Sequence, residues 1–154
     1  MSAPVVRVVT ESAAASRDVL EAIRRELRAF NRAANPAFYA LRDLPENAPR
    51  PLHVVAYDAE GTVVGGLIGD TCLAWLDIDI LSVRAADRGR GIGRLLMHAA
   101  EEEAVARGCR WAAVDTMDFQ APGFYARLGY AVVGTFEDRD GHGHTKHFLT
   151  RRIG

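Results

Sequence analysis

Residues 75–107 read WLDIDILSVRAADRGRGIGRLLMHAAEEEAVAR, and this stretch decides the fold. Its first part alternates and is rich in Ile, Leu and Val, which predicts a strand at 75–83. A glycine-rich segment, RGRGIG at 88–93, follows. Apolar residues then recur at helical spacing: Ile92, Leu95, Leu96, Ala99 and Ala100. The glycines therefore lie between a strand and the first turn of a helix.

A glycine-rich turn in this position can bind an anion. The first N–H groups of a helix have no partner inside the helix, and the helix dipole places partial positive charge there. Glycines let a ligand approach the backbone closely. Arg88, Arg90 and Arg94 add full charges around the same point. The segment predicts a site for phosphate or pyrophosphate.

The spacing of the glycines excludes two common phosphate loops. A dinucleotide-binding turn needs G-x-G-x-x-G, but the third glycine comes one residue early, at Gly93. A nucleoside-triphosphate loop needs Gly-Lys-Ser/Thr, a triplet the chain lacks. An Arg-x-x-Gly-x-Gly segment remains, and it resembles the pyrophosphate loop of the GNAT superfamily of acyl-CoA-dependent N-acetyltransferases. The alternative is a turn that only packs the helix on the sheet.

Length and composition predict one domain spanning 1–154. The chain has 154 residues, of which 49% are hydrophobic, and a formal net charge of −1. The mixed charges indicate no nucleic-acid or anionic membrane partner, and no apolar run approaches the ~20 residues of a membrane helix. Without a signal segment, a cytoplasmic location is expected. Cys72 and Cys109 are expected to be small buried hydrophobes, with a disulfide or catalytic thiol as the alternative.

Before the central stretch, the pattern predicts a strand at 5–10 and a helix opened by Ser16 or Arg17. Residues 31–51 hold four prolines among aromatics. They predict a short helix or irregular loop, which serves either as a connector or as a lid over an acceptor site. Strands at 52–57 and 62–68 form a predicted hairpin, with a bulge or bend at Gly65-Gly66. The predicted helix carries one apolar face: Val19, Leu20, Ile23, Leu27 and Phe30.

After the central helix, Gly108 predicts its end, and a strand at 110–115 returns parallel to the first through a right-handed crossover. Pro122 can open a short helix at 123–128. A final hairpin is predicted from strands at 130–137 and 147–151.

A second motif strengthens the resemblance. Residues 123–130, GFYARLGY, match the Phe-Tyr-x-x-x-Gly-aromatic ending of GNAT domains, and the likeness covers roughly 5–152. It implies an α/β GNAT fold with a central mixed sheet of about six to seven strands flanked by helices. The run at 115–125 and Gly143-His144 are similar to a branch of small bacterial members. One departure is Asp118, where many members carry an asparagine that contacts CoA.

The resemblance implies acetyl-CoA as the acetyl donor and assigns residues to it. The extended pantetheine arm could pair with one strand, and an N–H near Leu81 could stabilise the oxyanion. The implied cofactor residues are Leu81, Ser82, Val83, Arg88, Gly89, Arg90, Gly91, Ile92, Gly93, Arg94, Gln120 and Phe124.

Three residues are candidates for proton transfer. Tyr125 matches a family position that often protonates the leaving thiolate; the alternative is a core tyrosine. An alkylammonium of pKa ~10.4 must lose a proton before attack, so a base or water chain is needed. Asp77 and Asp79 lie about 7 Å apart on one strand face. Mutual repulsion and partial burial could raise one pKa, with Asp77 the main hypothesis. The alternative is a wet or salt-bridged face.

The remaining charged residues indicate no further site. His142, His144 and His147 lack the companions of a metal site, so no metal is expected, although His144 could line the acceptor pocket. Glu101, Glu102 and Glu103 are interpreted as a solvated helix face.

The acidic strand favours a small cationic amine as acceptor. The rivals are a protein lysine or N-terminal acetyltransferase, a non-catalytic acyl-CoA sensor and a plain nucleotide-binding domain. The last strands could also pair across a homodimer.

Overall fold

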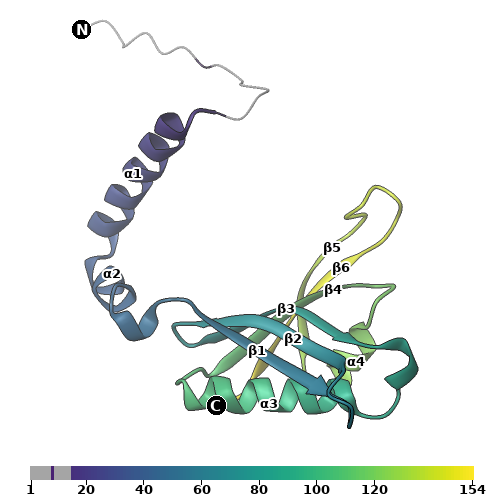
Figure 1. The fold of residues 1–154 in the computed structure, drawn as a ribbon. Helices are drawn as coiled ribbons and strands as arrows, with labels where there is room; N and C mark the ends of the chain where they lie inside the picture. The colour runs from purple at the N-terminus through teal and green to yellow at the C-terminus, as the bar shows by residue number, and fades with distance from the viewer. Residues whose placement is uncertain (1–7, 9–14) are drawn as a thin grey trace, which may run out of the picture. The chain divides into compact units, whose positions relative to one another are not determined.

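The computed structural model describes residue 8 and residues 15–154. The chain divides into two compact units, Met1–Asp43 and Leu44–Gly154 (Figure 1). The strand predicted at 5–10 lies outside the described residues, except for Val8. That one domain spans the chain stays a prediction.

The first unit contains two helices, α1 (Arg17–Ala34) and α2 (Pro36–Arg42). Ser16 caps α1 as predicted, because its hydroxyl accepts a hydrogen bond from the N–H of Val19 at 3.4 Å. Asn35 caps α2 in the same way at 3.0 Å from the N–H of Phe38. Helix α1 extends through Ala34, four residues into the segment expected to be a loop or a separate short helix. It stops there because the residue before a proline disfavours helical geometry.

Aromatic packing within the first unit centres on Tyr39, which is buried. The guanidinium groups of Arg32 and Arg42 lie 5.0 and 5.5 Å from its ring centroid. Phe38 meets the same ring edge-on at 5.3 Å. The segment does pack by its aromatics, as predicted. No described residue of this unit covers the apolar face of α1, which is exposed.

The second unit is built on a six-stranded sheet. Its elements are the 3-10 turn η1 (Pro45–Asn47), β1 (Arg50–Tyr57), β2 (Val63–Cys72), β3 (Trp75–Val83), the 3-10 turn η2 (Ala85–Asp87), α3 (Ile92–Ala106), β4 (Trp111–Met117), α4 (Pro122–Arg127), β5 (Ala131–Phe136) and β6 (Lys146–Arg152). The strand predicted at 75–83 and the loop and helix that follow it are confirmed. Both predicted hairpins are present, with strand bounds that differ from the predicted ones by up to four residues.

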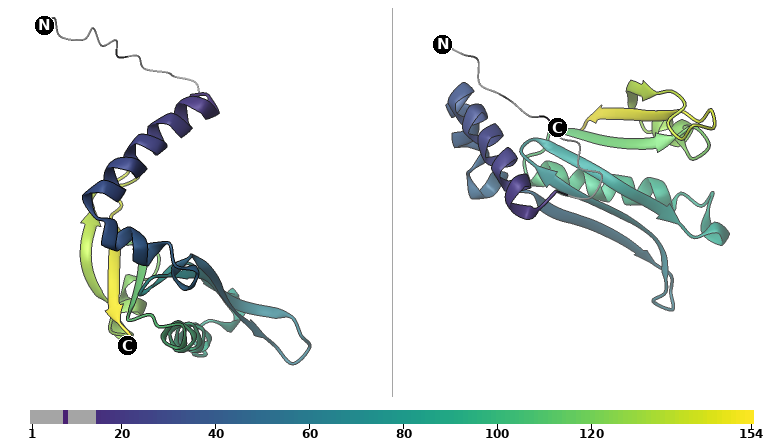
Figure 2. Two further views of the ribbon diagram at one scale, coloured as in Figure 1. Left: turned by 90° about the vertical axis from the view of Figure 1, so that its left-hand side faces the viewer. Right: turned by 90° about the horizontal axis from the view of Figure 1, so that it is seen from above.

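The strand order is β1-β2-β3-β4-β6-β5. β3 and β4 are parallel and the other pairs are antiparallel, so the sheet is mixed, as predicted. Helix α3 runs along one face of the sheet (Figures 1 and 2). Its Leu96, Met97 and Ala100 join the buried core that the strands supply. None of the helices formed by residues 15–154 combines the length and apolar composition that a membrane crossing requires.

Two bulges interrupt the pairing of β1, β2 and β3, and neither lies at Gly65-Gly66, where pairing is regular. One extra residue is Val64 on β2. The other is Asp79 on β3, opposite the step from Ile68 to Gly69. At Gly69 a Cβ atom would lie 2.3 Å from the carbonyl oxygen of Asp77, so only glycine permits this close approach.

Both cysteines are free. Cys109 is buried and its thiol lies 3.3 Å from the carbonyl oxygen of Trp75. Burial raises the pKa of this thiol, which suits an inert core residue. Cys72 is half-buried.

Candidate active site

The central strands β3 and β4 pair for only four residues and then separate. Their last paired residues are Ile78 and Val114. Beyond this point a cavity of about 640 Å³ opens, with Leu81, Ser82 and Val83 on one side and Asp115 and Thr116 on the other. The separation leaves this edge of β3 without a strand partner. An extended polar ligand could pair with it.

The glycine loop borders a second cavity of about 380 Å³. Gly89 and Gly91 have positive φ angles of 76° and 84°, which favour glycine. The N–H of Leu95 reaches the carbonyl of Gly91 at 3.1 Å. Before it, the N–H groups of residues 89–94 donate to no backbone carbonyl in the described part of the chain. The loop therefore leaves N–H donors free at the start of α3, as an anion site requires.

Gly93 contributes packing. A Cβ atom there would lie 3.3 Å from the ring of Phe124, so glycine lets α4 approach the start of α3. Phe124 lines the second cavity as well.

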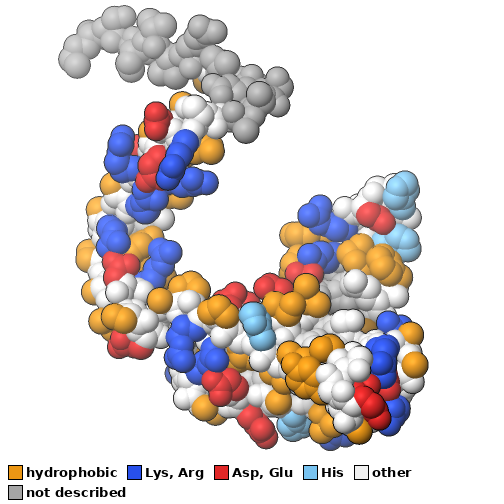
Figure 3. Space-filling model, in the orientation of Figure 1, with side chains coloured by type: hydrophobic (Ala, Val, Ile, Leu, Met, Phe, Trp, Pro, Cys, Tyr) orange, Lys and Arg blue, Asp and Glu red, His pale blue; other side chains and the backbone are white. Residues whose placement is uncertain are grey.

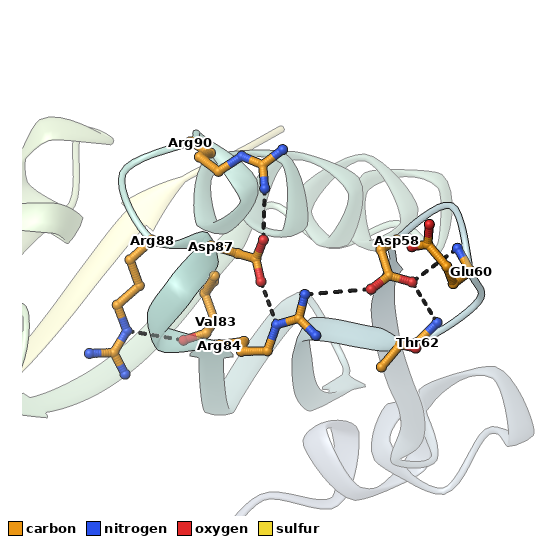
Figure 4. Close-up of polar contacts among 8 residues, drawn as sticks. All are labelled: Asp58, Glu60, Thr62, Val83, Arg84, Asp87, Arg88 and Arg90. Carbon is orange, nitrogen blue, oxygen red and sulfur yellow. Dashed lines mark hydrogen bonds and ion pairs between the residues drawn. The ribbon is translucent and has the colours of Figure 1, made fainter.

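A buried carboxylate holds one arginine of the glycine loop and one arginine that precedes the loop (Figure 4). Asp87 accepts a hydrogen bond from Arg84 at 2.5 Å and another from Arg90 at 2.7 Å. Arg84, and then Arg90, hold the pKa of Asp87 below its usual range. Arg84 also lies 3.5 Å from Asp58 in the β1–β2 turn. The loop is thereby tied to the neighbouring hairpin.

Figure 4 also shows that Arg88 and Arg90 differ in their engagement. The Nε of Arg88 donates to the carbonyl of Val83 at 3.0 Å, and the residue lines both cavities. Arg90 pairs with Asp87 instead. Arg94 lines the second cavity.

Tyr125 lies on the wall of the first cavity. Its side chain is buried, yet its hydroxyl has no hydrogen-bond partner among residues 15–154. Burial, and then the charge of Asp115, raise the pKa of this phenol, so it stays protonated at neutral pH. Tyr130, by contrast, donates to Glu101 at 2.8 Å. Tyr125 thus belongs to the buried core cluster and also lines the first cavity.

The predicted acidic pair is part of a larger cluster. Asp77 and Asp79 lie on the sheet face opposite α3, since Leu76 and Ile78, which alternate with them along β3, are buried. Asp70 on β2 lies directly opposite Asp77, which the sequence argument missed. Partial burial, then Asp70 and Asp79, raise the pKa of Asp77.

Of the two aspartates of the pair, only Asp79 lines the cavity that Tyr125 lines. Asp79 lines the cavity that contains Tyr125, whereas Asp77 lines an adjacent one of about 330 Å³, which Asp79 and Asp115 border too. Figure 3 shows acidic side chains in red along the upper rim of the sheet unit. Asp115 forms an ion pair with Lys146 at 2.8 Å.

Other predicted residues have local structural partners. The amide oxygen of Gln120 accepts from the N–H of Met117 at 2.7 Å, which folds this side chain back over the end of β4. Asp118 bonds to the N–H of Thr145 at 3.0 Å and to His144 at 3.2 Å. It therefore fastens the β5–β6 loop.

The solvated-face interpretation is wrong for Glu101. Its side chain is buried and accepts hydrogen bonds from Tyr130 and from Arg151, both at 2.8 Å. The apolar spacing of Met97, Ala100 and Ala104 on one helix face is the signal that could have placed it inside.

Comparison with known proteins gives consistent results. The acetyltransferase (GNAT) family matches residues 17–130. Blasticidin-S acetyltransferase of Streptomyces morookaense is 40% identical over 131 residues, which cover 82% of this chain and 96% of that protein. A 1.9 Å crystal structure of an acetyltransferase from Bacillus cereus ATCC 14579 has a TM-score of 0.76 and 30% identity, covering 94% of this chain and 98% of its own.

A more distant structure shares the fold alone. It is an aminoglycoside 6′-N-acetyltransferase complexed with coenzyme A, with a TM-score of 0.61 and 20% identity, covering 72% of this chain and 75% of its own. The family match, the curated relative and the fold agree. The chain belongs to the acetyltransferase (GNAT) family of acetyl-CoA-dependent enzymes.

Proposed function

We propose that the enzyme transfers the acetyl group of acetyl-CoA to a primary amine of a small cationic molecule, by direct attack in a ternary complex. The observation that carries this proposal is the separation of β3 from β4 after Ile78. It brings an unpaired strand edge, Tyr125 and Asp79 to one cavity beside the glycine loop.

The glycine loop would hold the pyrophosphate of the cofactor. Unpaired N–H groups at residues 89–94 are the donors, and Arg88 and Arg94 supply charge at the cavity wall. Arg90 would act less directly, because Asp87 engages its guanidinium. A protein of the same fold is known in complex with coenzyme A, which supports this assignment.

The pantetheine arm would lie along the free edge of β3. Its amides can hydrogen bond to the backbone of Leu81, Ser82 and Val83 as an added strand. Arg88 now donates to the carbonyl of Val83, so it would share or release that oxygen on binding. An N–H near Leu81 would then polarise the thioester carbonyl.

Attack by the deprotonated amine forms the C–N bond and breaks the C–S bond. The acceptor nitrogen gives up two protons in all, one before attack and one from the adduct, and the departing sulfur takes one up. Tyr125 would donate its hydrogen bond to the departing sulfur, which needs a proton because a thiol has a pKa of ~8.5. The ammonium of the acceptor would lose its proton towards Asp79 at the cavity wall and Asp77 beside it. The raised pKa of Asp77 strengthens it as a base.

The same carboxylates would select the acceptor. Asp70, Asp77 and Asp79 gather negative charge on one face of the sheet, which attracts a cation before attack. A relative at 40% identity is named for the acetylation of blasticidin S. That name supports an antibiotic-like amine as the first compound to test.

The test is a thiol-release assay with acetyl-CoA over blasticidin S, aminoglycosides, polyamines, amino acids and lysine peptides. We expect a small cationic amine to release CoA fastest, and Asp79→Asn to raise KM for that amine. Glu102→Gln is the matched control, since Glu102 is exposed on α3, on the other face of the sheet. Turnover confined to lysine peptides would contradict the small-molecule acceptor. Binding of acetyl-CoA without release from any amine would favour a sensor.

A further inference from the structure

A third cavity, of about 660 Å³, continues from the glycine loop to the other end of α4. Its walls carry three arginines and one histidine, and no carboxylate: Arg94, His98, Phe124, Arg127, Leu128 and Arg151. No sequence motif points to it, because its residues come from α3, α4 and β6. A concave surface lined by several guanidinium groups attracts a multiply charged anion.

Arg151 is held in place by the buried side chain of Glu101. Its Nη1 donates to Glu101 at 2.8 Å, and the buried Glu101 is fixed in turn by the hydroxyl of Tyr130 at 2.8 Å. A guanidinium has five N–H donors, so this bond leaves others for a ligand. A buried carboxylate and a buried phenol thus orient one arginine of the cavity. Because Arg151 is already held in one conformation, it loses little further side-chain entropy when a ligand binds.

Arg94 and Arg127 have no such partner. Neither takes part in an ion pair among residues 15–154. Both side chains are exposed at the rim. Two uncompensated positive charges beside Arg151 repel one another, and a bound anion would relieve that repulsion.

The three cavities form a continuous series. The basic cavity shares Arg94, Phe124 and Arg127 with the cavity of the glycine loop. That cavity shares Leu81 and Arg88, among others, with the one that contains Tyr125. Along this series the surface offers a reaction centre, then N–H donors for a pyrophosphate, then a basic pocket. Coenzyme A carries its groups in the same order: thioester, pyrophosphate and the 3′-phosphate of its ribose.

We infer that Arg94, Arg127 and Arg151 bind the 3′-phosphate of coenzyme A, with Glu101 and Tyr130 as positioning residues for Arg151. This inference rests on the proposed cofactor site. Arginine suits the role, because its planar fork can donate two hydrogen bonds to one phosphate group. The enzyme would accordingly discriminate between CoA and dephospho-CoA, which lacks only this phosphate.

The experiment is a calorimetric titration of the whole protein with CoA and with dephospho-CoA at one ionic strength. We expect CoA to bind at least about tenfold more tightly, since a hydrogen bond to a charged group contributes on the order of a factor of ten. Arg127→Gln and Arg151→Gln should each weaken CoA about tenfold and leave dephospho-CoA unchanged.

Arg152→Gln is the matched control, because Arg152 adjoins Arg151 on β6 and bonds only to the carbonyl of Gly154. Arg127→Gln guards against misfolding, since that exposed side chain has no ion pair to lose. Equal affinity for the two ligands would overturn the inference while the proposed function stands. A preference for CoA that survives both substitutions would overturn it too. If neither CoA nor dephospho-CoA bound, the cofactor site itself would be wrong, and the inference with it.

Discussion

Asp70 and Asp77 lie directly opposite each other in the antiparallel pairing of β2 with β3. Like charges so placed oppose each other's ionisation. Burial and this neighbour, with Asp79, raise the pKa of Asp77 above its ordinary value. An aspartate with a raised pKa is a stronger base at neutral pH than a free one. This arrangement supports the proposal that Asp77 accepts a proton beside the cavity that Tyr125 lines.

Asp70→Asn tests this arrangement through the pH profile. A base acts when deprotonated, so the acid limb of kcat/KM reports the pKa of Asp77. Removing the charge of Asp70 lowers that pKa, and the limb should move to lower pH. Asp77→Asn should abolish the limb and most of the turnover. An Asp77→Asn enzyme that keeps full turnover from pH 6 to 9 would remove Asp77 from the role of base.

Tyr125→Phe tests the leaving-group assignment. Loss of the hydroxyl should lower kcat by about 10²-fold, the lower range for general acid catalysis, and leave KM for acetyl-CoA nearly unchanged. The ring is retained, so its contacts with Phe124 and Tyr130 persist. Tyr57→Phe is the control, because Tyr57 is exposed at the end of β1. Undiminished turnover would show that Tyr125 is a structural core residue and not the general acid.

Asp87→Asn tests the anchoring of the glycine loop. The pKa of Asp87 is lower in the folded protein than in the unfolded chain, so its stabilisation is present above the unfolded value and is lost as pH falls through the folded one. The variant should melt at a lower temperature than the parent at pH 7. Its difference from the parent should disappear in acid. A difference in melting temperature that stays constant with pH would contradict an ionised Asp87.

Gly69→Ala tests the bulge at Asp79 on β3. The added Cβ would meet the carbonyl oxygen of Asp77 at 2.3 Å, so β2 and β3 must shift apart. We expect a loss of about 1–3 kcal/mol in the free energy of unfolding, as for other overpacked sites. Gly134→Ala is the control, because nothing lies within 4 Å of its added Cβ. Equal stability of the two variants would show that the bulge tolerates a side chain.

Local patterns predicted the strand, loop and helix at 75–107, because alternation, glycine spacing and helical periodicity act within a few residues. Long-range register was not visible in the same way. The placement of β6 between β4 and β5 and the buried contacts of Glu101 depend on residues far apart in the chain.

The position of Asp70 opposite Asp77 could have been predicted from the sequence. The two-residue turn at Leu73-Ala74 fixes which residues of β2 and β3 face each other. The bulge at Asp79 and the engagement of Arg90 by Asp87 required atomic coordinates. Sequence patterns predicted where the candidate site lies. The structure shows which of its side chains line the cavities and which support the glycine loop.

The most direct test of the proposed acetyl-CoA site is a calorimetric titration of the enzyme with acetyl-CoA, compared with a titration with ATP under the same conditions. The account predicts one site for acetyl-CoA and much weaker binding of ATP, because the series of cavities matches the full length of the cofactor. Failure to bind acetyl-CoA, or binding no tighter than that of ATP, would contradict the assignment of the glycine loop and of the strand edge beside it.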